Sequence, residues 1–445
     1  MKIKPAEQGK NTSGFGRRPG SIALRPWHII PLAALLLFSF LAGAISYRSG
    51  VLHPAAAFVK GVIKQGRFYP GLPEPVKEAA AALQEEVRLY QDNGLPTLYI
   101  DLPFESYQQL LQKRNEAIEI GVLNTTDEDF VPGQVQLQNG PKLDAKFRLK
   151  GDWTDHLEGE KWSFRIHLKE DGQILGTTQF SIQTPLARNF LNEWAFHKVL
   201  QKEGLLAPRY SFINVLVNGK LLGIYALEEN FAPELLESQG RRQGVIIRFN
   251  EDPFWQNISV FRSAGITKPS ELSVTTMDTA DITVFQESKV AQDPVLAAEA
   301  ETARGLLRAF QTGERPASEV FDVEQTGLFF ALHDLWRAEH GAAWHNLRFY
   351  YNPVTARLEP VAFDAMPFYT QLTDSTLASV FIKTRIFNDP QIRAAYARHL
   401  ERITRPDYID SIEQDLGEEH DRLKKALEVE FTEHSLPPYY TLSVD

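Results

Sequence analysis

The sequence contains no cysteine among its 445 residues. Disulfides, zinc–thiolate sites, iron–sulfur clusters and lipid attachment at a cysteine are therefore excluded. The sequence also lacks internal repeats and any long stripe of lysine and arginine, and its net charge is −10. Nucleic acid is therefore not an expected partner. The composition is 43% hydrophobic and 11% aromatic, which is enough to bury one large core or several smaller ones.

One long apolar run lies near the N-terminus. Residues 29–45, "IIPLAALLLFSFLAGAI", carry no charge and would span roughly 26 Å as a helix, close to the thickness of a bilayer core. Trp27 and Tyr47 flank the run, and basic residues are slightly more frequent before it than after it. The pattern predicts a single-pass membrane protein whose main domain lies outside the cytoplasm, in the periplasm or at the cell surface. A cleaved signal peptide is the alternative, because residues 42–44 read AGA.

The apolar run and the composition around it predict five segments. They are a disordered cytoplasmic tail (1–28), a transmembrane helix or uncleaved signal anchor (29–46), a stalk with one helix (47–94), a main domain (95–431) with an insertion at about 251–316, and a C-terminal tail (432–445).

Within the main domain, both strand and helix periodicities occur. In "KWSFRIHLK", Trp162, Phe164 and Ile166 alternate with polar residues that include Arg165 and His167, which predicts a strand with one buried face. Asn218-Gly219 predicts a hairpin turn. Residues 189–204, 323–340 and 390–431 have helical spacing. The expected class is α+β, with an antiparallel N-terminal sheet and a helical C-terminal part.

Several polar residues at the ends of these elements suit phosphoryl transfer from ATP. That chemistry uses a lysine fixed by a glutamate, together with an Asn and an Asp that hold metal ions. The lysine candidates are Lys161 and Lys150, the latter with Arg148 before it. The glutamate candidates are Glu193, Glu228 and Glu229. Asn346 and Asp364 flank a predicted hairpin and are the candidate metal ligands.

Three stretches resemble the CotH family of spore-coat protein kinases. They are "RLKGDWTDHLEGEKWSFRIHLK", "VNGKLLGIYALEENF", and "FDVEQTGLFFALHDLW" followed by "HNLRFYYNPVTARLEPVAFDA". The resemblance covers residues 95–431. It implies an atypical protein-kinase-like fold, ATP with Mg²⁺ or Mn²⁺ as cofactors, and transfer of phosphate to a protein substrate. By matching position, Lys161 would face the nucleotide, Glu229 would be the strand-end glutamate, and Asn346 and Asp364 would bind the metal ions.

The sequence departs from the CotH pattern at the position of the general base. The family has an aspartate five or six residues before the asparagine, whereas this chain has His340, with Glu339 beside it. A histidine can accept a proton near neutral pH. The chain is therefore either a phosphotransferase that uses His340, or a catalytically degenerate scaffold that binds an envelope partner or a polymer through its aromatic residues.

A hydrolytic metal site is a further alternative. It would use His333, His340, His345 and Asp364. No H-E-x-x-H or H-x-H spacing supports it.

Overall fold

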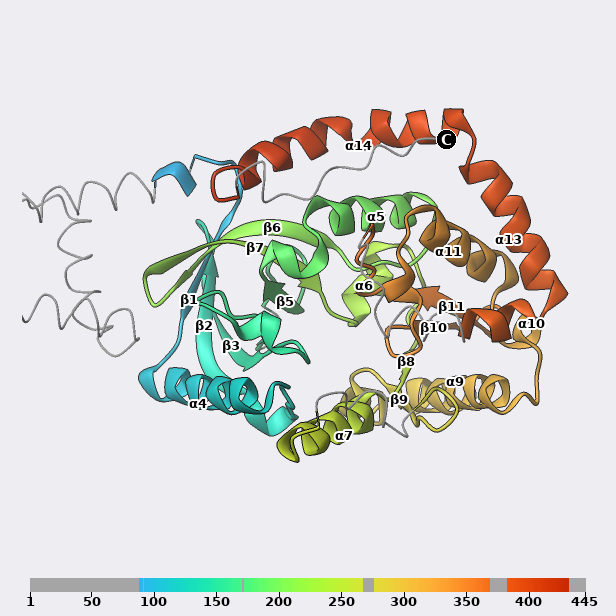
Figure 1. The fold of residues 1–445 in the computed structure, drawn as a ribbon, viewed down its shortest axis with the longest axis horizontal. Coiled ribbons are helices and arrows are strands. Elements are labelled where there is room, and N and C mark those ends of the chain that lie inside the picture. The colour runs from blue at the N-terminus through green and yellow to red at the C-terminus, as the bar shows by residue number, and fades with distance from the viewer. Residues whose placement is uncertain (1–87, 91, 170–171, 267–275, 369–381, 432–445) are drawn as a thin grey trace, which may run out of the picture. The chain divides into compact units, whose positions relative to one another are not determined.

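Seven of the described strands close into a barrel, in the order β1-β2-β3-β4-β5-β7-β6 (Figure 1). The computed structural model describes residues 88–90, 92–169, 172–266, 276–368 and 382–431, all within the compact unit Tyr69–Asp445. The barrel strands are β1 (Thr97–Asp101), β2 (Val131–Leu137), β3 (Lys142–Leu149), β4 (Phe164–Leu168), β5 (Gln179–Gln183), β6 (Tyr210–Val217) and β7 (Lys220–Glu229). The pairs are antiparallel except β1 with β6, which run parallel and complete the closure.

The barrel is filled by the apolar residues that alternate along its strands. On β4, Phe164 and Ile166 point into the core, whereas Arg165 and His167 are only partly buried, as the alternation predicts. The turn between β6 and β7 is confirmed at Asn218-Gly219, where both residues have positive φ. The side chain of Asn218 also bonds the backbone of Leu102, which fixes the end of β1.

A second sheet has the order β11-β10-β8-β9 among the described residues. Its strands are β8 (Ile246–Phe249), β9 (Ile282–Val284), β10 (Arg348–Asn352) and β11 (Arg357–Val361). The largest apolar core lies between this sheet and the helices around it, among them α9 (Pro294–Thr312), α11 (Val323–Leu335) and α13 (Pro390–Ile403) (Figure 1).

The other described helices pack on the barrel, on one another or beside the second sheet. They are α4 (Phe104–Ile120), α5 (Leu191–Lys202), α6 (Pro233–Ser238), α7 (Asp252–Ser263), α8 (Glu287–Val290), α10 (Ala317–Val320) and α14 (Pro406–Leu427). Short 3₁₀ turns lie at η1 (Asp127–Asp129), η2 (Thr154–Leu157), η3 (Pro185–Arg188) and η5 (Glu339–Ala342). Helix α4 packs on β2 and β3, and α14 packs along α5.

The predicted fold class is wrong. An α+β, kinase-like fold with an antiparallel N-terminal sheet was expected, but the strands close into a barrel through the parallel β1–β6 pair. Side-chain alternation shows which face of a strand is buried, but it does not show which strands are neighbours. The expected fold also included a transmembrane helix. None of the helices in the described ranges is both long and apolar enough to cross a bilayer, and the run at 29–46 lies outside those ranges.

Candidate functional site

A large cleft of about 1360 Å³ lies between the outer face of the barrel and the second sheet. One wall comes from β3, β4 and the turn η3. The other comes from β8, β9, η5 and the loop that follows β11. Acidic, basic and histidine side chains line the two walls. The cleft therefore brings together many ionisable groups from distant parts of the described chain.

A buried ion pair stands at the barrel wall. Lys150, which follows β3, donates from Nζ to Glu228 Oε2 at 2.5 Å and to Gln183 Oε1 at 2.9 Å. The exposed fractions of the Lys150 and Glu228 side chains are 6% and 2%. Burial lowers the pKa of Lys150 to about 8, although Glu228 opposes the shift. Burial disfavours the charged form of Glu228, but Lys150 and Arg188 outweigh it and lower the pKa of that carboxyl.

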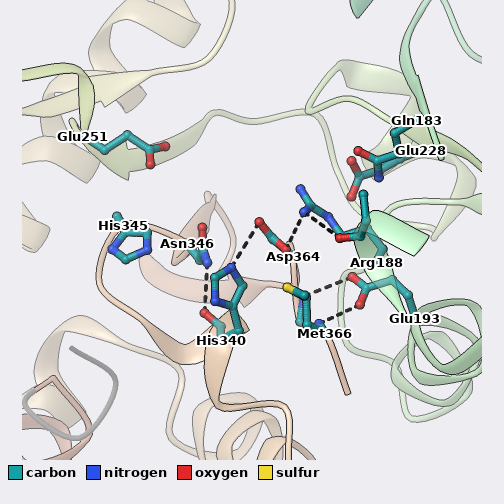
Figure 2. Close-up of polar contacts among 12 residues, drawn as sticks. Gln183, Arg188, Glu193, Glu228, Glu251, His340, His345, Asn346, Asp364 and Met366 are labelled. Atoms are coloured by element: carbon teal, nitrogen blue, oxygen red, sulfur yellow. Dashed lines mark hydrogen bonds and ion pairs between the residues drawn. The ribbon is translucent and has the colours of Figure 1, made fainter. Parts of the chain in front are cut away.

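Asp364 lies opposite this pair, on the loop after β11. Its Oδ1 lies 2.9 Å from Nη1 of Arg188, and its Oδ2 lies 3.4 Å from Nε2 of His340 (Figure 2). The Arg188 contact is an ion pair without the alignment of a hydrogen bond. Burial opposes ionisation, yet Arg188 and His340 hold the pKa of Asp364 well below its usual range. The carboxylate is therefore charged at neutral pH, with the Arg188 guanidinium beside one oxygen and the His340 ring beside the other.

Helix α5 holds the loop that carries Asp364. Glu193 accepts hydrogen bonds from the backbone amides of Ala365 (3.0 Å) and Met366 (2.8 Å), as Figure 2 shows. Its Oε1 also lies 3.2 Å from Nε2 of His197. Glu193 was predicted to pair with a nucleotide-binding lysine. The structure instead places this carboxylate beneath the Asp364 loop, where it positions the backbone.

Asn346, His340 and His345 lie beside Asp364 in the cleft. Asn346 donates from Nδ2 to the His340 carbonyl at 2.9 Å (Figure 2). Burial lowers the pKa of His345 to about 4, so this ring is neutral at pH 7. His340 is partly exposed and borders the cleft with Asn346. The structure thus brings together three residues that the sequence singled out: His340, Asn346 and Asp364.

The geometry does not form a ready metal site. Magnesium needs oxygen ligands that are free to coordinate it, but the oxygens of Asp364 face Arg188 and His340. Within the described ranges, no group of three or more histidine, aspartate or glutamate side chains is arranged to hold a metal ion. The hydrolytic alternative lacks support for a second reason: His333 is buried in the helical core and bonds through Nδ1 to the carbonyl of Phe329.

Three predicted residues lie away from the cleft. Lys161 contacts the carbonyl of Ile224 at 2.9 Å and forms an ion pair with Glu430. Glu229 is bound by Arg209, at 2.5 Å from Nη2 to Oε1. Glu339 begins η5 and does not line the cleft. Of the two predicted lysines, Lys150 is the one that the fold brings into the cleft, and Arg148 lines it as well.

Several charged residues of the cleft were not singled out from the sequence, among them Asp152, Arg165, Arg188 and Glu251. Arg188 and Glu251 carried no motif. Asp152 lies within a stretch that resembles the CotH family but has no role assigned by that resemblance. Arg165 is predicted only to lie on the polar face of its strand. Asp152 is an exposed residue on the wall of the cleft. Desolvation by the surrounding protein, together with the nearby Glu251, raises the pKa of its carboxyl, while Arg248 opposes the shift. Strand alternation pointed to Arg165, whereas only long-range packing identifies the other three.

The chain has no match among family models or among curated proteins. The resemblance to the CotH family therefore rests on the sequence motifs alone.

Proposed function

We propose that the cleft binds a nucleoside triphosphate, and that the protein is a CotH-like phosphotransferase acting on protein substrates at the cell envelope. The observation that carries the proposal is the buried Lys150, fixed by Glu228 and Gln183 on one wall of a cleft whose other wall holds Asp364 and Asn346. Phosphoryl transfer depends mainly on positioning and on neutralising phosphate charge. A lysine whose ammonium group is held by hydrogen bonds would position the phosphate and neutralise its charge.

The chain offers two candidates for the proton acceptor. His340 borders the cleft. Because its Nε2 faces the Asp364 carboxylate and donates toward it, the proton of a substrate hydroxyl would go to Nδ1 of the same ring. Asp152 is the second candidate, because its carboxylate lines the same cleft and its pKa is raised above the usual range of an aspartate. Substituting each in turn separates these roles.

Magnesium or manganese stays a prediction. Asn346 and Asp364 would serve as its ligands only if Arg188 and His340 released the Asp364 carboxylate. We therefore derive no step through a metal ion. Comparing ATP binding with and without the divalent cation tests this directly.

A catalytically inactive binding protein is the second candidate function. The observation in its favour is that Arg188 neutralises the Asp364 carboxylate and His340 occupies the side of its second oxygen. A cleft with this pairing would still attract phosphates through Lys150 and Arg148, but it would lack a carboxylate free to hold a metal ion.

Substituting Lys150 and Lys161 in turn tests the proposal that the cleft binds a nucleotide. ATP with Mg²⁺ should raise the melting temperature of the full-length protein, because the ligand binds only the folded state. The shift should persist in Lys161→Gln, whose lysine lies outside the cleft, and disappear in Lys150→Gln. Circular dichroism of each ligand-free variant checks that it folds.

Transfer of a radiolabelled γ-phosphate then separates the two candidate functions. A nucleotide-binding protein that transfers phosphate, and loses this activity in His340→Ala or Asp152→Asn, is the proposed enzyme. Binding without transfer identifies the inactive binding protein. No shift with ATP in the wild type would rule out the nucleotide proposal.

A further inference from the structure

Two arginines lie side by side on the barrel wall of the cleft. Arg148 on β3 and Arg165 on β4 are register partners in the antiparallel pair. Their neighbours Phe147 and Phe164 belong to the barrel core, so both arginines project from the opposite, outer face. Both line the cleft. Like charges directly opposite each other on paired strands destabilise a sheet, so this arrangement requires an explanation.

Arg148 is held firmly in place. Its Nη1 donates to the carbonyl of Thr126 at 2.9 Å, and its guanidinium lies 4.9 Å from the centre of the Phe130 ring. The nearest carboxylate is Asp127, at 3.6 Å, but that side chain is 98% exposed. A carboxylate so open to water does little to neutralise a guanidinium that is largely buried. Arg148 thus presents a fixed charge that is poorly compensated.

Arg165 has no carboxylate in contact with it, and Glu228 and Asp152 act on its charge only from a greater distance. Among the residues that the structure describes, its guanidinium has neither a hydrogen-bond acceptor nor a contact ion pair, and its Nε is buried. Burial, followed by Arg148 and Arg248, lowers the pKa of Arg165 to about 10, so the group remains charged at pH 7. A half-buried guanidinium that lacks a protein acceptor is costly, and such a cost is typical of a binding site rather than of a stabilising contact.

Other unsatisfied polar atoms line the same cleft. Nε2 of His167 on β4 and Oγ1 of Thr283 on β9 are both buried without a hydrogen-bond partner in the described ranges. Lys289 of α8 also borders the cleft. Burial, together with Arg165 and Arg148, lowers the pKa of His167 to about 3, so the ring is neutral and able to donate one hydrogen bond. The cluster therefore offers several donors to an acceptor from outside the chain.

We propose that Arg148 and Arg165 form a metal-independent subsite for the phosphate group of a ligand. Paired guanidinium forks match the geometry of phosphate oxygens and bind them through charge-assisted hydrogen bonds. If the phosphate belongs to a nucleotide, the subsite is part of the proposed nucleotide site and rests on that proposal. The phosphate of a phosphorylated peptide has the same chemistry. A small oxyanion alone is sufficient to test the arginine pair.

Inorganic pyrophosphate is the probe, titrated into the full-length protein in the presence of EDTA and followed by calorimetry. The wild type should bind it saturably, and the affinity should fall as NaCl is raised. Arg165→Gln should weaken binding by about tenfold or more, because it removes charge-assisted hydrogen bonds. Arg165→Lys should retain part of the affinity, because it keeps the charge without the fork. Arg114→Gln is the matched control, because Arg114 bonds the Leu157 carbonyl outside the cleft.

A second readout separates a binding role from a structural one. Arg165→Gln should raise the melting temperature of the ligand-free protein, because it relieves the repulsion with Arg148 while it weakens pyrophosphate binding. Parallel titrations with ATP in EDTA and with a phosphoserine peptide identify the source of the phosphate.

Failure of the subsite and failure of the proposed function have different signatures. If pyrophosphate does not bind the wild type, or binds Arg165→Gln equally well, the subsite is overturned even where ATP with Mg²⁺ still binds. If pyrophosphate binding depends on Arg165 but ATP has no effect on the protein, the subsite stands and the nucleotide proposal fails.

Discussion

At the scale of single residues, the cleft is built from charges that are buried in pairs. Lys150 pairs with Glu228, and Arg348 pairs with Glu251 at 3.1 Å. Such pairs contribute little net stability, because the cost of removing both charges from water offsets their attraction. Breaking one is nevertheless expensive, since the remaining charge stays buried alone. The value of the Lys150–Glu228 pair therefore lies in fixing the position of the lysine.

Substitutions at this pair should be strongly non-additive. Lys150→Met should cost about 3–5 kcal/mol in the free energy of unfolding, because Glu228 remains buried without its partner. The double variant Lys150→Met/Glu228→Leu should recover most of that loss. Urea denaturation measures both. The exposed pair Lys142–Asp101 is the control, and Lys142→Met should leave the urea midpoint nearly unchanged, because water already solvates both charges. Equal losses in the single and double variants would contradict this account.

At the scale of elements, the loop after β11 is the least relaxed part of the site. Asp364, Met366 and Phe368 all have positive φ, between 45° and 59°. Residues other than glycine rarely adopt this backbone conformation. It costs free energy, so surrounding contacts must enforce it. Two contacts do so: Glu193 of α5 accepts from the loop amides, and Asn189, which lies between η3 and α5, donates to the Pro367 carbonyl at 2.5 Å. Helix α5 therefore acts as the support that aims Asp364 into the cleft.

Removing the charge of Glu193 should loosen this loop selectively. In Glu193→Gln, the backbone amides of Ala365 and Met366 lose a carboxylate acceptor, and their hydrogen exchange should accelerate at least tenfold. Amides of β2, a strand that does not line the cleft, should keep their protection. Glu229→Gln is the matched control, because that buried carboxylate binds Arg209 outside the cleft. Unchanged exchange at Ala365 and Met366 would show that Glu193 does not hold the loop.

At the scale of the whole molecule, buried neutral histidines link stability to pH. Burial lowers the pKa of His156 and His167 to about 3, and that of His333 and His345 to about 4. The unfolded chain binds these protons near pH 6.5, so each of these histidines removes stability as the pH falls from there toward its folded pKa. His197 acts in the opposite sense: burial lowers its pKa, but Glu193 outweighs burial and raises it.

His333 tests this linkage, because it is fully enclosed in the helical core. The wild type should lose roughly 1.4 kcal/mol of unfolding free energy per pH unit through this residue between about pH 6 and pH 4.5. His333→Gln does not titrate, so its stability should fall less steeply over the same interval. Urea midpoints at several pH values, each variant compared with its own value at pH 7, provide the measurement. Parallel curves would show that His333 contributes no linkage.

Some of the fold was predictable because its signals are local. The hairpin at Asn218-Gly219 follows from the backbone preferences of two residues, and the face of β4 follows from alternation. Helix α5 was expected at 189–204 and extends over Leu191–Lys202. Barrel closure was not predictable, because the parallel pairing of β1 with β6 joins segments far apart in the chain.

The candidate site divides in the same way. The sequence by itself determined the residue types that suit phosphate chemistry, and it singled out His340, Asn346 and Asp364, which lie close together in the chain. Only the tertiary structure decided that Lys150 rather than Lys161 faces the cleft, since Lys150 meets Glu228 across 78 residues of sequence. Only the tertiary structure shows that Arg188 forms an ion pair with Asp364 and that Arg165 lies beside Arg148. Local periodicity determines which face a side chain occupies, whereas the partner of a buried charge depends on how distant segments pack.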